Sequence, residues 1–386
     1  MDDGARRGSI FPRVRATYTG VAIFLLNAVV LFVGFNLVVA WFHRGQSDDN
    51  LLWPLLTQRL PAIYPDLSPA ERDELARAML GHMVYEPYTD LAHSPVRGRF
   101  LNVDADGFRW GRERPPWPIE PAAYNVFAFG GSTTFGYGVP DGDTVPSFLQ
   151  ERLGRVGGKP VRVYNFGRSA YYSTQERILF ERLVTAGHVP DAVVFVDGLN
   201  EFSTVDDVPF GAAFLRERAA LRGAGWAQAL RTLADLLPLT TTARHLARLM
   251  GIEDAAQPAA PSRFDDPEVA DHVLARWVRS KTLIEGGARA SGVSATFVWQ
   301  PIPTYGGADV EAEARAPVSN RAAFGYRRMA AYAAEHPLGP RFVWCAEPGD
   351  GALERLYVDA VHYGPVMADR VARCIADAML ARGLVP

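Results

Sequence analysis

The chain has 386 residues, of which 48% are hydrophobic and 22% are charged. This composition excludes a disordered or fibrous protein and provides for one substantial core with appendages. The formal net charge of -3, with no long basic run and no zinc-type spacing of cysteine and histidine, argues against nucleic acid as a partner.

Residues 20–42 form an apolar run without a charged side chain. Because a helix needs about 20 residues to cross the hydrocarbon core of a membrane, we predict a transmembrane helix over 20–42. Arginines are more frequent before the run than just after it, which by the positive-inside rule predicts a cytoplasmic tail over 1–19. Those before it are Arg6, Arg7, Arg13 and Arg15. The rest of the chain is then expected in the periplasm, tethered to the inner membrane by a single pass.

A cleaved signal peptide is the competing interpretation of this run. Signal peptides have an apolar core of about 7 to 15 residues, and the run here is longer. The sequence Val-Ala-Trp-Phe at its end is also a poor cleavage site, so an uncleaved signal anchor is favoured.

Residues 43–120 are expected to form a stalk and a lead-in segment before the main domain. Ser68 and Pro69 predict the start of a helix over 70–83. Asp104 and Asp106 resemble part of a calcium loop, but the remaining ligands of an EF-hand are missing. We therefore expect a packed turn at these two aspartates.

From residue 121 onward, apolar strand-like runs alternate with helices. The runs are continuous in apolar residues, as parallel strands covered on both faces should be. They are 124–129, 161–165, 192–196, 295–299 and 341–345. The alternation predicts a doubly wound α/β domain over 121–386 with a five-stranded parallel sheet.

Two of the intervening helices have readable ends. Thr144, or the residue before it, begins a helix that stops at Gly154, and Ser173 with Glu176 forms a predicted capping box for the next helix. Residues 202–251 break the alternation, and we predict a helical insertion there. The insertion is either a lid or substrate platform beside the site or a packing appendage, and both interpretations stay open.

Cys345 and Cys374 are the only cysteines of the chain. A disulfide needs their Cα atoms within about 4.4 to 6.8 Å, a distance that the sequence does not give, and an oxidising compartment to persist. We expect two unpaired buried cysteines.

Four short blocks, three of them directly after strand-like runs, together supply the parts of a serine hydrolase. They are 130–134, 165–167, 198–200 and 359–362. A serine hydroxyl is a poor nucleophile near neutral pH, so an imidazole must take its proton, and a carboxylate usually fixes the tautomer of that imidazole. Ser132, His362 and Asp359 provide these groups, because Asp359 and His362 are three residues apart on one face of a turn or helix start. Ligands of doubly wound sheets bind at the carboxyl ends of the strands, where the blocks are predicted to lie.

Asp90 and His93 have the same spacing as Asp359 and His362. They precede the first strand of the main domain and run into Ser94 and Pro95, whereas Asp359 and His362 precede a long closing helix. We expect His93 to be a structural or surface residue.

The four blocks, in this order, resemble the SGNH (GDSL-type) hydrolase family, over about residue 124 to the C-terminus. The resemblance implies that Ser132 is the nucleophile and that His362 is the base with Asp359 beside it. It also implies that Gly167 and Asn200 complete an oxyanion hole with the backbone N–H of Ser132. The first block reads Gly-Gly-Ser-Thr-Thr where Gly-Asp-Ser-Leu is usual, a variant of membrane-anchored, envelope-associated bacterial members. No metal or organic cofactor is implied.

These residues predict a membrane-tethered serine esterase or acyltransferase, whose substrate is an acylated small molecule or the acyl ester of an envelope glycan or lipid. Tyr172 and Gln300 lie just beyond strand ends and are candidates to line the substrate cleft, although such positions are also ordinary packing sites. Two other functions stay open. One is a lipase or thioesterase for longer acyl chains, and the other is a non-catalytic polysaccharide-assembly role with an envelope protein as partner. Retention of Ser132 and His362 together argues against the second.

Overall fold

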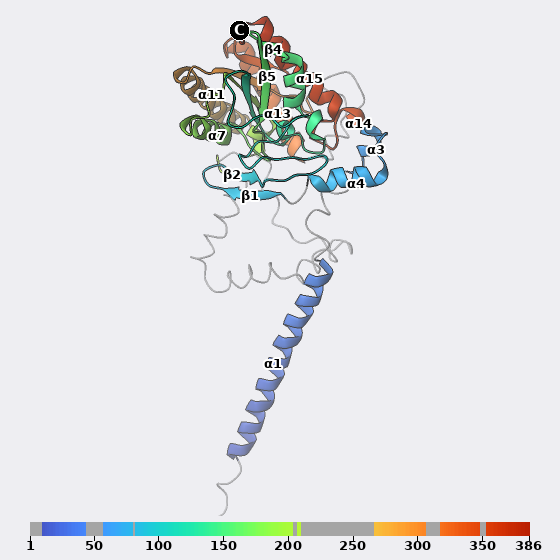
Figure 1. Cartoon of the computed structure of the whole chain (residues 1–386). Coiled ribbons are helices and arrows are strands. Elements are labelled where there is room, and N and C mark those ends of the chain that lie inside the picture. The colour runs from blue at the N-terminus through green and yellow to red at the C-terminus, as the bar shows by residue number, and fades with distance from the viewer. Residues whose placement is uncertain are drawn as a thin grey trace, which may run out of the picture. The chain divides into compact units, whose positions relative to one another are not determined.

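The computed structural model describes residues 10–43, 57–79, 82–203, 207–209, 266–305, 317–347 and 353–386. The chain divides into two compact units (Figure 1). The smaller is Met1–Asn50 with Arg218–Ala259, and the larger is Leu51–Glu217 with Ala260–Pro386. The predicted insertion over 202–251 lies almost wholly outside the described residues.

The described part of the smaller unit is one long helix, α1 (Ile10–His43). Its stretch Thr17–Val39 has a mean hydropathy of 2.5 and is only 6% buried. By length and composition this stretch can cross a membrane, and an N-terminal signal sequence meets the same criteria. The run predicted over 20–42 is therefore helical.

The larger unit is built on a mixed sheet with the strand order β4-β5-β3-β6-β7-β8. Five of its strands are parallel and correspond to the five predicted runs. They are β3 (Tyr124–Gly130), β5 (Lys159–Asn165), β6 (Ala192–Asp197), β7 (Ser294–Trp299) and β8 (Phe342–Trp344). The strand that the sequence did not predict is β4 (Arg155–Val156), which pairs antiparallel with β5 across a tight turn. Two residues are too few to give a periodic signal.

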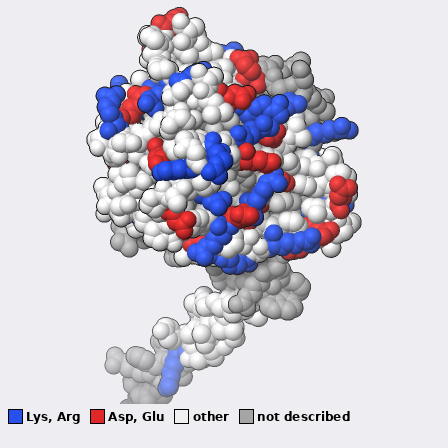
Figure 2. All heavy atoms as spheres, turned by 45° about the horizontal axis from the view of Figure 1, so that its top comes forward, with Lys and Arg blue, Asp and Glu red and all other residues white. Residues whose placement is uncertain are grey.

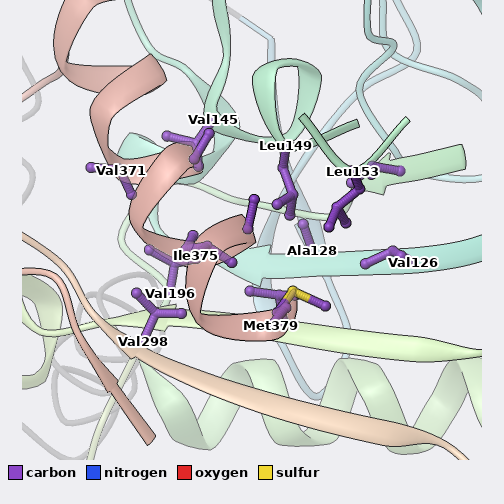
Figure 3. Packing of buried hydrophobic residues seen from close by; sticks show 14 of the residues in the cluster. Val126, Ala128, Val145, Leu149, Leu153, Val196, Val298, Val371, Ile375 and Met379 are labelled. Atoms are coloured by element: carbon purple, nitrogen blue, oxygen red, sulfur yellow. The ribbon is translucent and has the colours of Figure 1, made fainter. Parts of the chain in front are cut away.

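Helices cover both faces of the sheet, as the doubly wound prediction requires. On one face, α6 (Val145–Leu153) and α15 (Pro365–Ala381) pack against Val126 and Ala128 of β3 (Figure 3). On the other face, α7 (Ser173–Thr185), α11 (Pro267–Ala290) and α13 (Pro317–Glu335) surround Phe127 and Phe129 of the same strand. Alternate residues of β3 thus enter two different cores, because successive side chains of a strand point to opposite faces.

The described part of the segment predicted as a stalk and lead-in, residues 57–79 and 82–120, belongs to the larger unit rather than standing apart from it. It forms α3 (Leu60–Ile63), α4 (Pro69–Ala78) and an antiparallel pair, β1 (Met83–Glu86) and β2 (Asp90–His93). Leu60, Leu75 and Phe100 are buried in one cluster with Phe135 and Val358 of the main domain. The stalk interpretation is therefore wrong for this segment, since its apolar side chains are part of a shared core. In Figure 1 these elements lie at one end of the unit, and the C-terminus and β4 at the other.

Local predictions in this segment hold at two places. Ser68 caps α4, accepting from the backbone N–H of Glu71 while the Glu71 carboxylate accepts from the backbone N–H of Ser68. Asp104 is buried in a turn, where its carboxylate accepts from Arg97, Arg114 and Trp110. The region around Asp104 therefore forms a packed turn, as predicted.

Of the two helix starts predicted in the main domain, one is confirmed and one is wrong. Thr144 caps α6, which ends at Gly154 as predicted. The predicted capping box of α7 does not form, because the cap position is Tyr172 and no side chain caps the helix. The hydroxyl and backbone N–H of Ser173 donate instead to the carboxylate of Glu201. A long-range partner therefore replaces the local one.

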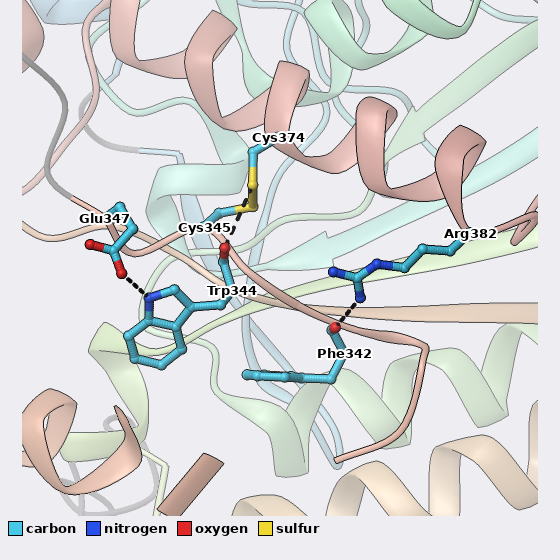
Figure 4. Close-up of a disulfide and its surroundings, with 6 residues drawn as sticks. All are labelled: Phe342, Trp344, Cys345, Glu347, Cys374 and Arg382. Carbon is cyan, nitrogen blue, oxygen red and sulfur yellow. Dashed lines mark hydrogen bonds between the residues drawn. A yellow bond between two sulfur atoms is a disulfide. The ribbon is translucent and has the colours of Figure 1, made fainter. Parts of the chain in front are cut away.

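Cys345 and Cys374 form a disulfide with their Cα atoms 6.0 Å apart (Figure 4). The expectation of two unpaired cysteines is wrong. Cys345 directly follows β8 and Cys374 lies on α15, and the packing of this helix against the sheet brings the two within bonding distance. The disulfide encloses the segment that leads from β8 through Asp359 and His362 to α15.

Charged side chains of both signs are interspersed over the face seen in Figure 2. In the larger unit, Arg152 of α6 and Asp369 of α15 form a pair of opposite charges. This face offers no single-sign patch of the kind that binds a polyanion.

Candidate active site

The four blocks meet at the carboxyl edge of the sheet. Ser132 begins the short helix α5 (Ser132–Phe135) directly after β3, and Gly167 lies two residues beyond β5. Asn200 lies in the 3-10 helix η2 (Leu199–Ser203) that follows β6, and His362 shortly precedes α15. The sheet topology therefore places side chains from four distant parts of the sequence at one edge, as predicted.

Ser132, His362 and Asp359 form a continuous hydrogen-bonded chain. The Nε2 atom of His362 lies 2.8 Å from the Oγ atom of Ser132. The Nδ1 atom of His362 lies 2.6 Å from Oδ2 of Asp359. The side chains of His362 and Asp359 are 19% and 12% exposed, so the chain is reachable from solvent. This is the arrangement of a serine nucleophile, its base and an orienting acid.

The base loop, residues 357–363, is a tight turn organised by Asp359. Tyr357 and Tyr363 form an antiparallel bridge, and the N–H of Val358 donates to the carbonyl of His362. Oδ1 of Asp359 accepts from the backbone N–H groups of Val361 and His362, at 2.7 and 2.8 Å. One carboxylate oxygen therefore shapes the turn, while the other orients the imidazole.

The same contacts decide the charge of Asp359. Burial by itself raises the pKa of this carboxyl, but the charge of His362 and the hydrogen bonds that the carboxylate accepts have the larger combined effect. The net result is a pKa below the usual value of an aspartate. Asp359 is therefore negatively charged at neutral pH.

Two of the three predicted oxyanion donors are open in this structure. The N–H of Ser132 has no acceptor among the residues that the structure describes. The amide of Asn200 donates one N–H to the carbonyl of Tyr171 at 2.8 Å, and an amide has a second. The amide lies against Gly131, where a Cβ atom would be 2.2 Å from Nδ2 of Asn200, so only glycine fits there.

The third predicted donor, the N–H of Gly167, is already engaged. It donates to Oδ1 of Asn165 at 3.0 Å. The amide of Asn165 in turn donates to the carbonyls of Thr134 and Phe135. Gly167 packs tightly on the turn that carries the serine, since a Cβ atom at 167 would lie 2.4 Å from the backbone nitrogen of Phe135. Its role as an oxyanion donor stays a prediction.

Tyr172 and Gln300, the predicted cleft residues, are both only 2% exposed. Oε1 of Gln300 accepts from the hydroxyl of Thr133 at 2.6 Å and from that of Tyr363 at 3.0 Å. Gln300 thus links by hydrogen bonds Thr133, which follows Ser132, and Tyr363, which follows His362. The guanidinium of Arg276 lies over the ring of Tyr172, with its Cζ atom 4.8 Å from the ring centre. In this structure both side chains support the site from within, and contact with substrate stays a prediction.

A buried acidic cluster behind Asn200 was not predicted from the sequence. Asp197 ends β6, and Glu201 directly follows Asn200. Glu176 on α7 is the third member, and all three are nearly inaccessible to solvent. Burial is the first cause of a raised pKa at each, and it brings the pKa of Asp197 to about 8. The cluster is therefore not fully ionised at neutral pH.

Arg109 is hydrogen-bonded to the end of the nucleophile turn, residues 130–136. Its guanidinium is buried and donates to the carbonyls of Phe135 and Gly136 at 2.9 and 2.7 Å. The same group donates to Asp141 at 2.8 Å and to the carbonyl of Val139 at 2.7 Å. Nothing in the residues around Arg109 predicted this role, apart from its position between Phe108 and Trp110.

His93, the alternative histidine, is 8% exposed and packs on Phe135 with ring centres 3.8 Å apart. Burial lowers its pKa to about 3. Its nearest hydroxyl is that of Ser169, 3.4 Å from Nε2. His93 is therefore a neutral packing residue, as the sequence context indicated.

A cavity of about 450 Å³ lies along α7, beginning at Arg168, the residue after Gly167. Its other lining residues include Trp117, Arg182 and Glu86. Glu86 accepts from both arginines, so these three charges are paired within the protein. Among the described residues no group of three or more His, Cys, Asp or Glu side chains is arranged to hold a metal ion.

No protein-family model matches the sequence, and no curated protein matches it. Several solved structures are similar over two-thirds of the chain. A member of the lipolytic G-D-S-L family from Veillonella parvula is 14% identical, with 67% of this chain and 96% of that chain covered and a TM-score of 0.34. A carbohydrate acetylesterase family member from Sinorhizobium meliloti is 15% identical, covering 67% and 98%, with a TM-score of 0.37. A lipase from a goat rumen metagenome is 10% identical, covering 66% and 97%, with a TM-score of 0.39. Likenesses at this level do not assign a substrate.

Proposed function

We propose that this protein is a membrane-tethered serine esterase or acyltransferase that cleaves an acyl ester outside the inner membrane. One observation carries the proposal. The Ser132 hydroxyl, both ring nitrogens of His362 and the Asp359 carboxylate form one chain with contacts of 2.8 and 2.6 Å. A serine that merely packs has no need of a base whose far side is held by a charged carboxylate.

The chemistry follows from the direction of these hydrogen bonds. With Nδ1–H of His362 donating to Asp359, Nε2 is left to accept the proton of Ser132. The Oγ atom forms a bond to the acyl carbon, and collapse of the tetrahedral species breaks the ester C–O bond. His362 returns the proton to the departing alkoxide. Water, or a sugar hydroxyl in a transferase, then gives its proton to His362 and releases the acyl group from Ser132.

The negative charge on the carbonyl oxygen needs donors close to Ser132. The backbone N–H of Ser132 and the second amide N–H of Asn200 are suited to this by position. Each such donor typically contributes about 3 to 4 kcal/mol to transition-state stabilisation. Gly167 would join them when its N–H is shared between Asn165 and the substrate oxygen.

The location and the substrate are inferred from features outside the site. The apolar stretch of α1 supports a tether, and the arginines before it support a cytoplasmic N-terminus. The disulfide between Cys345 and Cys374 supports an oxidising compartment, since such bonds rarely persist in the cytosol. An enzyme held there meets acylated envelope glycans and lipids, and we propose these as its substrate class.

The direct test compares wild type with Ser132→Ala, using the full chain in mild detergent. We expect wild type to hydrolyse short-chain nitrophenyl esters and to react with a fluorophosphonate probe, and the variant to do neither. Ser169→Ala is the matched control, because Ser169 also lies beside a histidine, and it should keep both activities. Folded wild-type protein with neither turnover nor label would contradict the proposal.

Substrate class is tested by acyl length and by carrier. Release of acetate from O-acetylated polysaccharide, with nitrophenyl ester turnover falling as the acyl chain lengthens, is the expected result. Turnover that rises with chain length would instead favour a lipase or thioesterase.

A further inference from the structure

We propose that Arg59 is a positioning residue that holds the base loop, and with it His362, in its working geometry. The inference rests on the proposed function, in which His362 is the base. Arg59 immediately precedes α3, about 300 residues before the loop in sequence. Its Nη1 atom donates to the carbonyl oxygen of Asp359 at 2.7 Å and, more weakly, to that of Tyr357 at 3.4 Å.

This contact supplies what the base loop does not supply for itself. Both carboxylate oxygens of Asp359 are in use, one in shaping the turn and one on His362. The peptide carbonyl of Asp359 is bonded by Arg59, which comes from outside the loop. Hydrogen bonds from a charged donor are shorter and stronger than neutral ones. A rotation of this peptide would move the carboxylate away from Nδ1, so Arg59 restrains the contact that orients the base.

Arg59 is itself anchored by apolar packing. The next residue, Leu60, is 1% exposed and lies in the cluster that contains Phe135 and Val358. Ile63, at the end of α3, faces Gly364, where a Cβ atom would lie 3.5 Å from its Cδ1 atom. The apolar cluster therefore touches the end of the nucleophile turn and the base loop together. The chain between residues 57 and 120 therefore contacts both parts of the proposed site: Arg59 bonds the base loop, and Arg109 bonds the nucleophile turn.

Arg72 provides a matched control within the same segment. Its Nη1 atom also donates to two backbone carbonyls, of Leu67 at 2.7 Å and of Tyr64 at 3.2 Å. Neither of these is in the nucleophile turn or the base loop. Arg72→Met should therefore show the structural cost of losing such an arginine, without the effect on the base.

The experiment uses the full chain in detergent and the variants Arg59→Met, Arg59→Lys and Arg72→Met. Arg59→Met should lower kcat on a nitrophenyl ester by about ten- to a hundredfold, with KM changed by less than about twofold, because the base is displaced while binding is kept. Arg59→Lys should recover part of the loss, since an ammonium reaches the Asp359 carbonyl as a single donor. Arg72→Met should lower Tm as much as Arg59→Met does, with kcat unchanged.

A second measurement does not need turnover. The proton shared by Nδ1 of His362 and Asp359 should give a low-field proton NMR resonance, identified by its loss in His362→Gln. We expect this resonance in wild type and in Arg72→Met, and its broadening or loss in Arg59→Met. If wild type hydrolyses no ester, the proposed function fails while the resonance still decides the role of Arg59. Equal kcat and an unchanged resonance in Arg59→Met and Arg72→Met would show that Arg59 is merely structural.

Discussion

In the proposed reaction the nucleophile turn and the base loop carry the two halves of the chemistry, but they are held in different ways. The nucleophile turn leaves the central strand β3, is enclosed by close glycine contacts and rests on the buried guanidinium of Arg109. The base loop lies beyond the edge strand β8, is partly exposed and is held by a few polar contacts of Asp359 and Arg59. Core packing fixes the first, and directed hydrogen bonds fix the second.

This difference predicts how substitutions will behave. In the nucleophile turn, a change that disturbs geometry also opens the core, so stability and activity should fall together. In the base loop, a change of one hydrogen bond should reduce activity strongly while the free energy of unfolding falls by only about 0.5 to 1.5 kcal/mol. The two regions can therefore be separated by measuring kcat/KM and the free energy of unfolding on the same variants.

The largest expected effect on activity is that of Asp359→Asn. The side-chain oxygen at Oδ1 can still accept from Val361 and His362, so the loop should keep its shape. The amide that replaces Oδ2 donates towards Nδ1, which forces the proton of His362 onto Nε2 and prevents it from acting as a base. We expect kcat/KM to fall on the order of 10⁴-fold, with the free energy of unfolding lowered by about 0.5 to 1.5 kcal/mol, the net contribution of one hydrogen bond. A fall of less than about tenfold would mean that the tautomer is set by some group other than Asp359.

The largest expected effect on stability is that of Arg109→Met. The substitution removes a buried cation, the partner of Asp141, and leaves four backbone carbonyls without the arginine as donor. Breaking a buried pair in this way typically costs about 3 to 5 kcal/mol, to be measured by urea unfolding. The control is Arg112→Met, because Arg112 pairs with Glu151 while their side chains are 56% and 62% exposed. That change should cost less than about 1 kcal/mol. Similar losses in the free energy of unfolding for the two variants would contradict the view that core packing holds the nucleophile turn in place.

The parts of the molecule that the sequence predicted are those with local signals. Continuous apolar runs marked the five parallel strands, and the polar blocks after three of them marked the edge where Ser132 now lies. Thr144 and Ser68 were readable as caps because a cap bonds within its own first turn. The contact of His362 with Ser132 followed from the topology of parallel sheets rather than from spacing.

The parts that sequence reasoning missed depend on distant partners. Ser173 and Glu176 have capping-box spacing, but Glu201 takes the hydrogen bonds of Ser173 and Glu176 turns into the core. The disulfide depends on how α15 packs beside β8. Arg59 bonds a carbonyl about 300 positions away, and nothing in the residues around it indicates that partner. Such contacts are set by tertiary packing, which has no period in the sequence.

The smallest expected effect concerns carboxyl groups, and it compares Asp359 of the base loop with the buried acidic cluster behind Asn200. The pKa of Asp359 in the base loop is lowered, so its folded state favours the charged form. Burial raises the pKa of Glu176 and Asp197 in the core, that of Asp197 from 3.8 to about 8. The folded state thus retains protons here that the unfolded chain has lost. By linkage, this contribution to stability is greatest below about pH 4, declines as pH rises, and stops declining above about pH 8.

Glu176→Gln tests this sign, since glutamine resembles the protonated acid and cannot lose a proton. We expect the free energy of unfolding to decline less steeply between about pH 5 and about pH 8 in the variant, by at most about 1.4 kcal/mol per pH unit for each proton involved. Glu181→Gln on the same helix is the control, because Glu181 is exposed and paired with Arg177, and it should leave the slope as in wild type. A slope in Glu176→Gln that matched wild type would mean that Glu176 is charged in the folded state, and that the acidic cluster does not differ in charge from Asp359 of the base loop.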